Sequence, residues 1–276
     1  MSTQPHVTFN DGRTIPQIGL GVWQTPNDVA VTAVEAALGA GYRHIDTAAI
    51  YQNEEGVGEG IRASGVARAD IFLTTKVWND DQGFESTLRA MDASLKRLGT
   101  DYVDLYLIHW PSAFRGKYVE TWKALVRLRE EGKARSIGVS NFEGDYIEQI
   151  IAATGVNPAL NQIQLHPRFQ QKAMRAKHER LGILTESWSP LRQGKLLEHP
   201  VLAAIAARHG KSVAQIIIRW HLDSGLVVIP KSVTPSRIVE NFDVFDFTLT
   251  DQDKAEIAGL DASDGRLGSD PVTAKF

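Results

Sequence analysis

The sequence predicts an α/β fold in which eight strand-helix units close a (β/α)8 TIM barrel. Short, β-branched apolar runs of strand length recur along the chain, and segments of helical periodicity lie between them. Eight strand candidates in 276 residues give about 34 residues per unit, close to the smallest βαβ unit. We also expect an N-terminal β-hairpin cap and a C-terminal loop over the barrel mouth.

The first expected element is a hairpin within residues 6–16. Asn10, Asp11 and Gly12 tolerate positive φ angles and lie between short β-prone segments. The strand candidates that follow are 17–21, 41–46, 71–76, 102–110, 134–140, 158–164, 182–188 and 225–231. Helical patterns span 28–41, 84–99 and 118–132, and each ends at a glycine that suits a helix C-cap.

The chain contains no low-complexity stretch, charge run or Pro/Ser-rich linker in which a domain boundary could lie. We therefore expect one domain over residues 1–276. Residues 264–276 have no periodicity, so we expect this tail to form the surface loop over the barrel mouth.

Composition excludes several classes of function. The 30 Lys and Arg against 33 Asp and Glu give a formal charge of −3, which disfavours nucleic acid or an anionic membrane as partner. The absence of cysteine excludes disulfides, thiolate nucleophiles and Cys-ligated metals. The N-terminus lacks the features of a signal peptide, and no apolar run reaches about 18 residues. We expect a cytoplasmic protein, a monomer, without a metal site.

Polar residues end several of the apolar runs, and their spacing follows the βα repeat. Lys76 lies 30 residues after Asp46, and His109 lies 33 residues after Lys76. In a parallel barrel the active site forms at the C-terminal ends of the strands, so these groups should meet in one cavity with Tyr51 one loop away. Taken singly, Asp46 could cap a helix, Lys76 could be a surface lysine, His109 a structural histidine and Tyr51 a loop aromatic.

A second group of polar residues follows the last strand candidate. Lys231, Ser232, Thr234, Arg237 and Asn241 combine a cation, hydroxyls and a guanidinium where barrels commonly bind phosphate. A solvated helix start with Pro235 in its first turn is the alternative interpretation. The glycines of residues 56–60 have the wrong spacing for a dinucleotide fingerprint and lie in an expected helix, so we reject them as a phosphate loop.

Three segments resemble the aldo-keto reductase superfamily. They are residues 41–58 (GYRHIDTAAIYQNEEGVG), 135–142 (RSIGVSNF) and 229–241 (IPKSVTPSRIVEN). Within the superfamily the sequence looks closest to the bacterial 2,5-diketo-D-gluconate reductases, through segments such as WNDD, VDLYLIHWP and ESWSPL. The resemblance covers nearly the whole chain and implies a (β/α)8 barrel.

The resemblance implies a catalytic tetrad of Asp46, Tyr51, Lys76 and His109 that acts with NADPH. Reduction of a carbonyl produces an alkoxide, so its oxygen needs a proton donor and electrostatic stabilisation. Tyr51 would be the acid, and we expect the Lys76 charge to lower its pKa. Asp46 would hold Lys76 by a salt bridge, while His109 would orient the carbonyl oxygen by a hydrogen bond.

The resemblance also implies the residues that hold the cofactor. Ser140, Asn141 and Gln162 would bind the nicotinamide carboxamide, and Trp188 would stack on its ring. Leu191 and Gln193 would pass the pyrophosphate, Lys231, Ser232 and Arg237 would hold the 2′-phosphate, and Glu240 and Asn241 would bind the adenine end. Trp23, Trp78 and Trp110 match the substrate pocket, although packing at the barrel rim is an equal alternative.

Two residues depart from the diketogluconate reductase pattern. Ser189 replaces a glycine, which could alter the local loop, and Thr234 replaces an arginine that some of those enzymes carry beside the phosphate. The function expected is NADPH-dependent reduction of aldehydes, α-dicarbonyls or keto-sugars. The alternatives are a non-catalytic, NADPH-binding redox-sensing module and a Schiff-base aldolase that uses Lys76.

Overall fold

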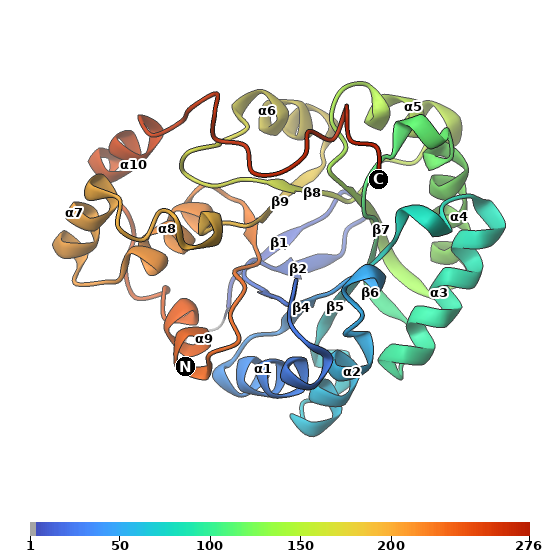
Figure 1. The fold of residues 1–276 in the computed structure, drawn as a ribbon, viewed down its shortest axis with the longest axis horizontal. Coiled ribbons are helices and arrows are strands. Elements are labelled where there is room, and N and C mark those ends of the chain that lie inside the picture. Colours follow the sequence, from blue (N-terminus) through green and yellow to red (C-terminus); the bar gives the residue numbers. More distant parts are fainter. Residues whose placement is uncertain (1–3) are drawn as a thin grey trace.

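The computed structural model describes residues 4–276 and confirms the predicted barrel. Eight parallel strands form one sheet in the order β3 to β10, as in the sequence. Parallel bridges from Ile18 to Val228 and from Gly21 to Lys231 join the last strand to the first and close the barrel. Figure 1 shows the helices arranged around the strands.

The strands follow the sequence expectations, although several are shorter. They are β3 (Leu20–Gly21), β4 (His44–Asp46), β5 (Phe72–Val77), β6 (Val103–Ile108), β7 (Ala134–Ser140), β8 (Leu160–Gln164), β9 (Leu184–Trp188) and β10 (Val227–Val228). The helices are α1 (Asn27–Ala40), α2 (Glu54–Ala63), α3 (Phe84–Leu98), α4 (Tyr118–Glu130), α5 (Tyr146–Thr154), α6 (Lys172–Leu181), α7 (Pro200–His209), α8 (Val213–Asp223), α9 (Pro235–Phe242) and α10 (Asp251–Ala258).

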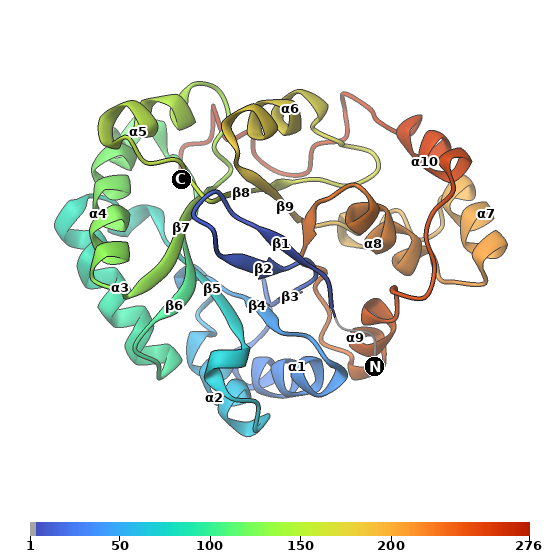
Figure 2. The ribbon, with the colours of Figure 1, turned by 180° about the vertical axis from the view of Figure 1, so that it is seen from behind.

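The predicted N-terminal hairpin is present. Strands β1 (His6–Thr8) and β2 (Thr14–Pro16) pair antiparallel, and Gly12 turns between them at φ 84°. Figure 2 shows the hairpin lying across the end of the barrel that faces away in Figure 1. Phe9 and Ile15 of the hairpin are buried in a cluster with Leu105, Leu107 and other barrel residues. The hairpin therefore covers the end opposite the strand termini discussed below.

The glycines of residues 56–60 serve helix packing. A Cβ on Gly56 would lie 1.9 Å from the Asn27 carbonyl oxygen, and one on Gly58 would lie 2.2 Å from that of Leu98. Helix α2 can therefore approach α1 and α3 only because these positions carry no side chain. This close packing agrees with their rejection as a phosphate-binding loop.

Two α-helices, α7 and α8, separate β9 from β10, whereas each other pair of consecutive barrel strands is separated by one α-helix. Among residues 4–276 no single helix is long and apolar enough to cross a membrane, and α7 and α8 reach that length only as a pair bent by 86°. Buried residues of both helices, including Leu202, Ile205, Ile216 and Trp220, form a cluster against the barrel.

The C-terminal tail crosses the other end of the barrel, as predicted. Figure 1 shows it running in red from α10 over the sheet to the C-terminus. Arg266 makes three hydrogen bonds of 2.9 to 3.1 Å to the Glu143 carboxylate, and the Leu267 amide donates to Gln164 Oε1 at 2.9 Å. These contacts hold the tail on the loop that follows β7 and on the end of β8.

Candidate active site

The strand-end residues expected to meet do meet. Asp46 ends β4, Lys76 lies near the end of β5, His109 directly follows β6, and Tyr51 lies in the short helix η1 (Ala49–Tyr51). Lys76 Nζ donates to Asp46 Oδ1 at 2.6 Å and to the Thr47 carbonyl oxygen at 2.8 Å. The same Nζ lies 5.3 Å from the centroid of the Tyr51 ring, and the Tyr51 and His109 ring centroids are 5.5 Å apart.

Burial dominates the electrostatics of this cluster. Burial raises the pKa of Tyr51, and the Lys76 charge lowers it by a smaller amount. The lowering expected from Lys76 is therefore present but is outweighed, because the surrounding protein shields much of the phenol from water. Burial alone would lower the pKa of Lys76, but Asp46 and Tyr51 together raise it, so the ammonium stays charged. Burial and Lys76 hold the pKa of His109 well below its usual range, which keeps the imidazole neutral.

The amide and hydroxyl side chains of β7 and β8 form a buried network beside this cluster. Ser140 Oγ donates to the Gln162 carbonyl oxygen at 2.8 Å, and Asn141 Nδ2 donates to the His109 carbonyl oxygen at 3.0 Å. Gln162 Nε2 donates to Asp46 Oδ2 at 2.8 Å and to Glu186 Oε2 at 2.8 Å. Both amide hydrogens of Gln162 therefore point into the barrel.

Trp188 is fixed by the same network. Its indole Nε1 donates to Asn141 Oδ1 at 2.9 Å. Asn141 itself adopts φ 61°, a left-handed backbone conformation that asparagine tolerates better than most residues. The direct bond between Trp188 and Asn141 is a contact that the sequence did not predict, because 47 residues separate the two.

Three connected cavities open at this end of the barrel. The one that we call the inner cavity has a volume of about 260 Å³ and is lined by Asp46, Tyr51, His109, Ser140, Asn141, Gln162 and Trp188, among others. The outer cleft, of about 870 Å³, shares Trp23, Ser189, Pro190, Gln193 and Lys231 with it. The aromatic pocket, of about 350 Å³, shares Trp23, Tyr51, His109, Trp110 and Phe276 with it.

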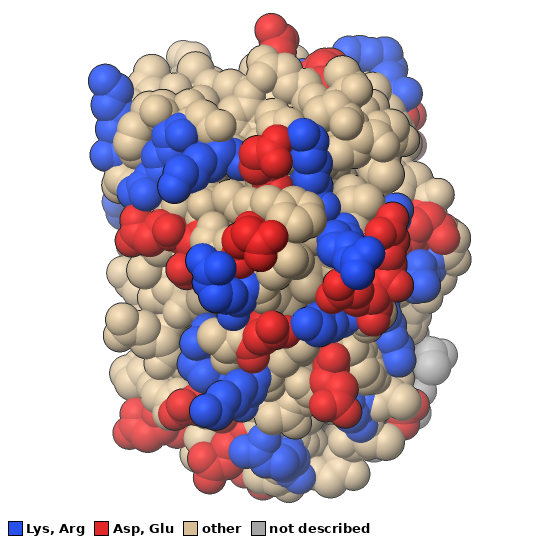
Figure 3. All heavy atoms as spheres, turned by 90° about the vertical axis from the view of Figure 1, so that its right-hand side faces the viewer, with Lys and Arg blue, Asp and Glu red and all other residues tan. Residues whose placement is uncertain are grey.

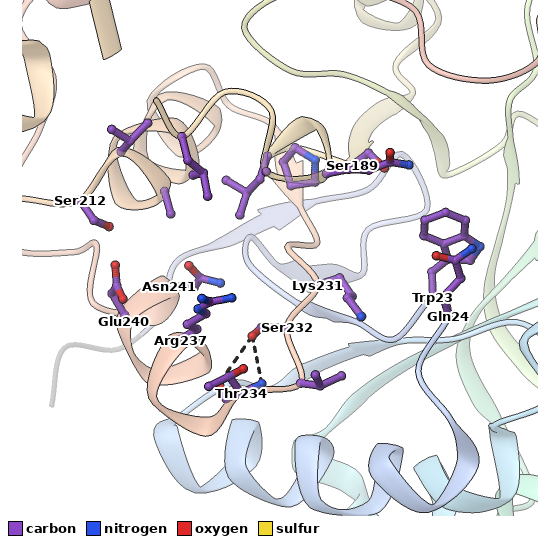
Figure 4. A pocket seen from close by; sticks show the side chains of 18 residues that line it. Trp23, Gln24, Ser189, Ser212, Lys231, Ser232, Thr234, Arg237, Glu240 and Asn241 are labelled. Atoms are coloured by element: carbon purple, nitrogen blue, oxygen red, sulfur yellow. Dashed lines mark hydrogen bonds between the residues drawn. The ribbon is translucent and has the colours of Figure 1, made fainter. Parts of the chain in front are cut away.

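The outer cleft contains the second predicted group of residues. Lys231, Ser232, Arg237, Glu240 and Asn241 all line it. Figure 4 shows that Arg237, Glu240 and Asn241 come from one helix, α9, while Lys231 and Ser232 precede it. Leu191 and Gln193 line the cleft as well, between its inner and outer ends.

The two departures from the diketogluconate reductase pattern also lie in the outer cleft. Thr234 lines it, and its backbone N–H donates to Ser232 Oγ at 3.2 Å. Ser189 adopts φ 50°, a conformation that favours the glycine it replaces.

The aromatic pocket contains the three tryptophans expected to bind substrate. Trp23, Trp78 and Trp110 line it together with Phe276, whose ring stacks on Trp78 at a centroid distance of 6.1 Å. Phe276 is not among the residues predicted from the sequence, because no local signal marks it. Asn79 Nδ2 donates to the Phe276 carbonyl oxygen at 3.0 Å across 197 residues of sequence.

Three buried residues could be considered for a metal ion. Ligand atoms of His44, Asp46 and Glu186 lie within 4.8 Å of one another. However, Lys76 Nζ already lies 2.6 Å from Asp46 Oδ1 and supplies the positive charge that this carboxylate needs. A second cation here would be repelled by the lysine, so this arrangement suits an ion pair rather than a metal centre.

The charges on the outer surface are interspersed. On the face shown in Figure 3, basic and acidic side chains alternate and form no broad patch of one sign. Pairs such as Lys133–Asp92 and Arg127–Glu131 link neighbouring charges on α3 and α4 and on the turns that follow α4. This face offers no continuous basic surface of the kind that nucleic acids require.

The mouth of this α/β barrel carries a buried Asp-Lys ion pair, a tyrosine and a neutral histidine. These groups suit an enzyme that protonates and orients a carbonyl oxygen. The sequence profile of the Aldo/keto reductase family matches residues 17–262, and the chain belongs to this family. The resemblance found in the sequence is thus confirmed, and the protein is an oxidoreductase.

Individual relatives show which members of the family the chain resembles. The chain is 51% identical over 273 residues to methylglyoxal reductase DkgA of Escherichia coli strain K12, covering 98% of each chain. The crystal structure of a Gox0644 mutant in complex with NADPH is 53% identical, with a TM-score of 0.96 and full coverage of both chains. The structure of a putative 2,5-diketo-D-gluconic acid reductase B is 38% identical, with a TM-score of 0.92 over 96% of this chain and 94% of that chain.

Proposed function

We propose that this protein reduces small aldehydes and α-dicarbonyls such as methylglyoxal to alcohols, with NADPH as the reductant. The observation that carries the proposal is the position of Tyr51 and His109. Both side chains line the inner cavity and the aromatic pocket, and the Tyr51 ring centroid lies 5.3 Å from the Nζ of Lys76, which is paired with Asp46. We also propose that residues 1–276 act as one domain and as a monomer.

The side chains that line the cavities suit NADPH. The outer cleft has cationic side chains, Lys231 and Arg237, suited to a phosphate group. The inner cavity is lined by the hydroxyl and amides of Ser140, Asn141 and Gln162, which suit a planar carboxamide. Trp188 lines the same cavity and offers an aromatic face for the nicotinamide ring. When bound there, the reduced nicotinamide supplies a hydride to the carbonyl carbon.

The protein's own residues manage the proton. Tyr51 donates its phenol proton to the carbonyl oxygen as negative charge develops on it, and Lys76 stabilises the phenolate that remains. Asp46 holds Lys76 in position through the 2.6 Å contact. His109, kept neutral by burial, offers a second hydrogen bond that orients the carbonyl oxygen.

The lining of the aromatic pocket favours a small, uncharged substrate. Its polar side chains are Gln24, Tyr51 and His109, and it contains no Lys or Arg among its lining residues. The carboxylate of a keto-sugar acid would lose its hydration there without gaining a cationic partner. We therefore place methylglyoxal and similar dicarbonyls ahead of keto-sugars.

The geometry argues against the aldolase alternative. A Schiff base forms from a neutral amine, whereas Lys76 is fully buried, ion-paired to Asp46 and held in its charged form. A non-catalytic sensor would bind NADPH without turning over any carbonyl. The turnover assay described next tests this alternative.

The decisive experiment compares the wild-type protein with Tyr51→Phe. We expect the wild type to oxidise NADPH with methylglyoxal or phenylglyoxal, and Tyr51→Phe to lose about 10²- to 10⁴-fold in kcat while still binding NADPH. Binding of NADPH without turnover across a panel of carbonyls would favour the sensor. Undiminished turnover by Tyr51→Phe would refute the role of the tyrosine.

A further inference from the structure

One buried carboxyl group near the Lys76–Asp46 pair has no part in the proposed proton transfer. Glu186, on β9, has no exposed surface. Its Oε2 accepts a 2.8 Å hydrogen bond from Gln162 Nε2, and its Oε1 lies 3.7 Å from His44 Nε2 without a hydrogen-bond partner. A buried carboxyl oxygen without a hydrogen-bond partner costs stability, and its presence calls for an explanation.

The first consequence of Glu186 is the orientation of Gln162. An amide nitrogen carries two hydrogens, and here Asp46 Oδ2 and Glu186 Oε2 accept one each at 2.8 Å. A flipped amide would turn its oxygen toward two carboxyl oxygens. Gln162 is thus left with only its Oε1 as a group to offer a ligand in the inner cavity that it lines.

The second consequence concerns charge. Asp46 accepts from two donors, Lys76 and Gln162, and is therefore the carboxylate that balances the ammonium. An ionised Glu186 would leave the buried cluster with one uncompensated negative charge. Burial, with the nearby Asp46 carboxylate, raises the pKa of Glu186 to about 8, so the group holds its proton at neutral pH.

Titratable groups on three elements surround Glu186. His44 and Asp46 face it from β4, Lys76 interacts with it electrostatically from β5, and Tyr51 does so from η1. Burial lowers the pKa of His44 to about 3, so the imidazole is neutral, and its Nε2 lies 3.7 Å from Glu186 Oε1 and 3.3 Å from Thr74 Oγ1. The neighbours on β8 and β10 that pair with Glu186, Gln162 and Val227, carry no charge.

We propose that Glu186 is a positioning residue for the reaction: as a neutral acid it locks Gln162 so that its carbonyl oxygen faces the N–H of a carboxamide ligand. The inference rests on the proposed function, since the carboxamide is that of NADPH. It adds that at alkaline pH, where Glu186 ionises, the carboxylate still accepts from Gln162 but its charge opposes formation of a phenolate at Tyr51.

Two variants of Glu186 test the proposal. E186Q keeps an oxygen for Gln162 and a hydrogen for His44, and so imitates the neutral acid. E186A removes one of the two acceptors of the Gln162 amide and leaves Asp46 as the other. The exposed Glu59 on α2 supplies the matched control E59Q. NADPH affinity is measured by quenching of tryptophan fluorescence, and thermal stability is measured from pH 6 to pH 9 in the absence of cofactor.

We expect E186A to raise the Kd for NADPH about five- to tenfold, the loss of one hydrogen bond, with E186Q and E59Q within twofold of the wild type. The melting temperature of the wild type should fall relative to E186Q as the pH rises toward and past 8. The melting temperature falls because the raised pKa of Glu186 lets the folded protein keep a proton that the unfolded chain has already lost, so a rise in pH favours unfolding. The wild type should also lose kcat above pH 8 while E186Q does not.

Each outcome decides the proposal. An unchanged Kd in E186A, or E186Q as impaired as E186A, would overturn the lock while leaving NADPH binding by the wild type intact. If the melting temperatures of the wild type and E186Q changed in parallel with pH, the proposal that Glu186 is a neutral acid would be overturned. Failure of the wild type to bind NADPH would overturn the proposed function and this inference together.

Discussion

The inner cavity and the outer cleft differ in how their polar groups are held. In the inner cavity, Asp46, Asn141 and Gln162 are buried and each makes hydrogen bonds to other protein groups. In the outer cleft, Lys231 and Arg237 are exposed, and no hydrogen bond or salt bridge joins either side chain to another described residue. The protein thus fixes the groups that act on the reacting atoms and leaves free those that would meet phosphate.

This difference has an energetic meaning. Buried groups in fixed positions need no reorganisation when charge develops, and low polarity strengthens their electrostatic effect. Exposed cations attract an anionic ligand from solution, but water and salt screen each contact. Substitutions in the inner cavity should therefore affect rate and stability, and those in the outer cleft should affect affinity and its salt dependence.

The largest effect is expected from Lys76→Met. It leaves the buried Asp46 carboxylate without its cation, so the free energy of unfolding should fall by about 3–5 kcal/mol and turnover should be lost. Chemical denaturation measures the stability. The double variant Lys76→Met with Asp46→Leu removes both charges and should regain most of the stability but none of the activity. A stable single variant would show that Asp46 is not held as a buried carboxylate.

The next effect is expected from Arg237→Gln in the outer cleft. The KM for NADPH should rise about tenfold, the cost of one charge-assisted hydrogen bond, with kcat nearly unchanged. The KM for NADH should not change. Raising the salt concentration should reduce the difference in the KM for NADPH between variant and wild type. Lys254→Gln, an exposed substitution on α10, is the control. An equal rise for NADH would place Arg237 away from the 2′-phosphate.

A smaller effect is expected from Trp188→Phe, which keeps an aromatic face but loses the 2.9 Å bond to Asn141. Loss of this bond is worth about 1 kcal/mol, so the Kd for NADPH should rise about fivefold. Fluorescence titration through the remaining tryptophans measures this. An unchanged Kd would mean that Asn141 keeps its orientation without the indole.

The smallest effect is expected from Ser189→Gly. Ser189 lines both the inner cavity and the outer cleft. Relief of the left-handed conformation at φ 50° should exceed the entropy cost of glycine, so the protein should gain less than about 1 kcal/mol in stability. Ser224→Gly, at a position of φ −88°, should lose stability instead. Thermal unfolding of the two variants compares them, and a loss for both would show that Ser189 is unstrained.

The sequence predicted the barrel and the convergence of Asp46, Lys76 and His109 because parallel strands bring their C-terminal ends to one rim. It did not predict the direction of the Tyr51 pKa, since that depends on how much water the folded loops exclude. It also left Glu186 without a role, because the partner that gives it one, Gln162, is known only from the packing of β8 against β9.

The burial of Lys76 has a consequence for the lifetime of the enzyme. Dicarbonyls are electrophiles that modify amines and guanidinium groups, so with the substrates proposed above the protein would be exposed to damage by its own substrate. Lys76 has no exposed surface and no free electron pair, because its ammonium is bound by Asp46 and the Thr47 carbonyl. Within the outer cleft, the exposed side chains of this kind are Lys231 and Arg237, and there a bound dinucleotide would protect them.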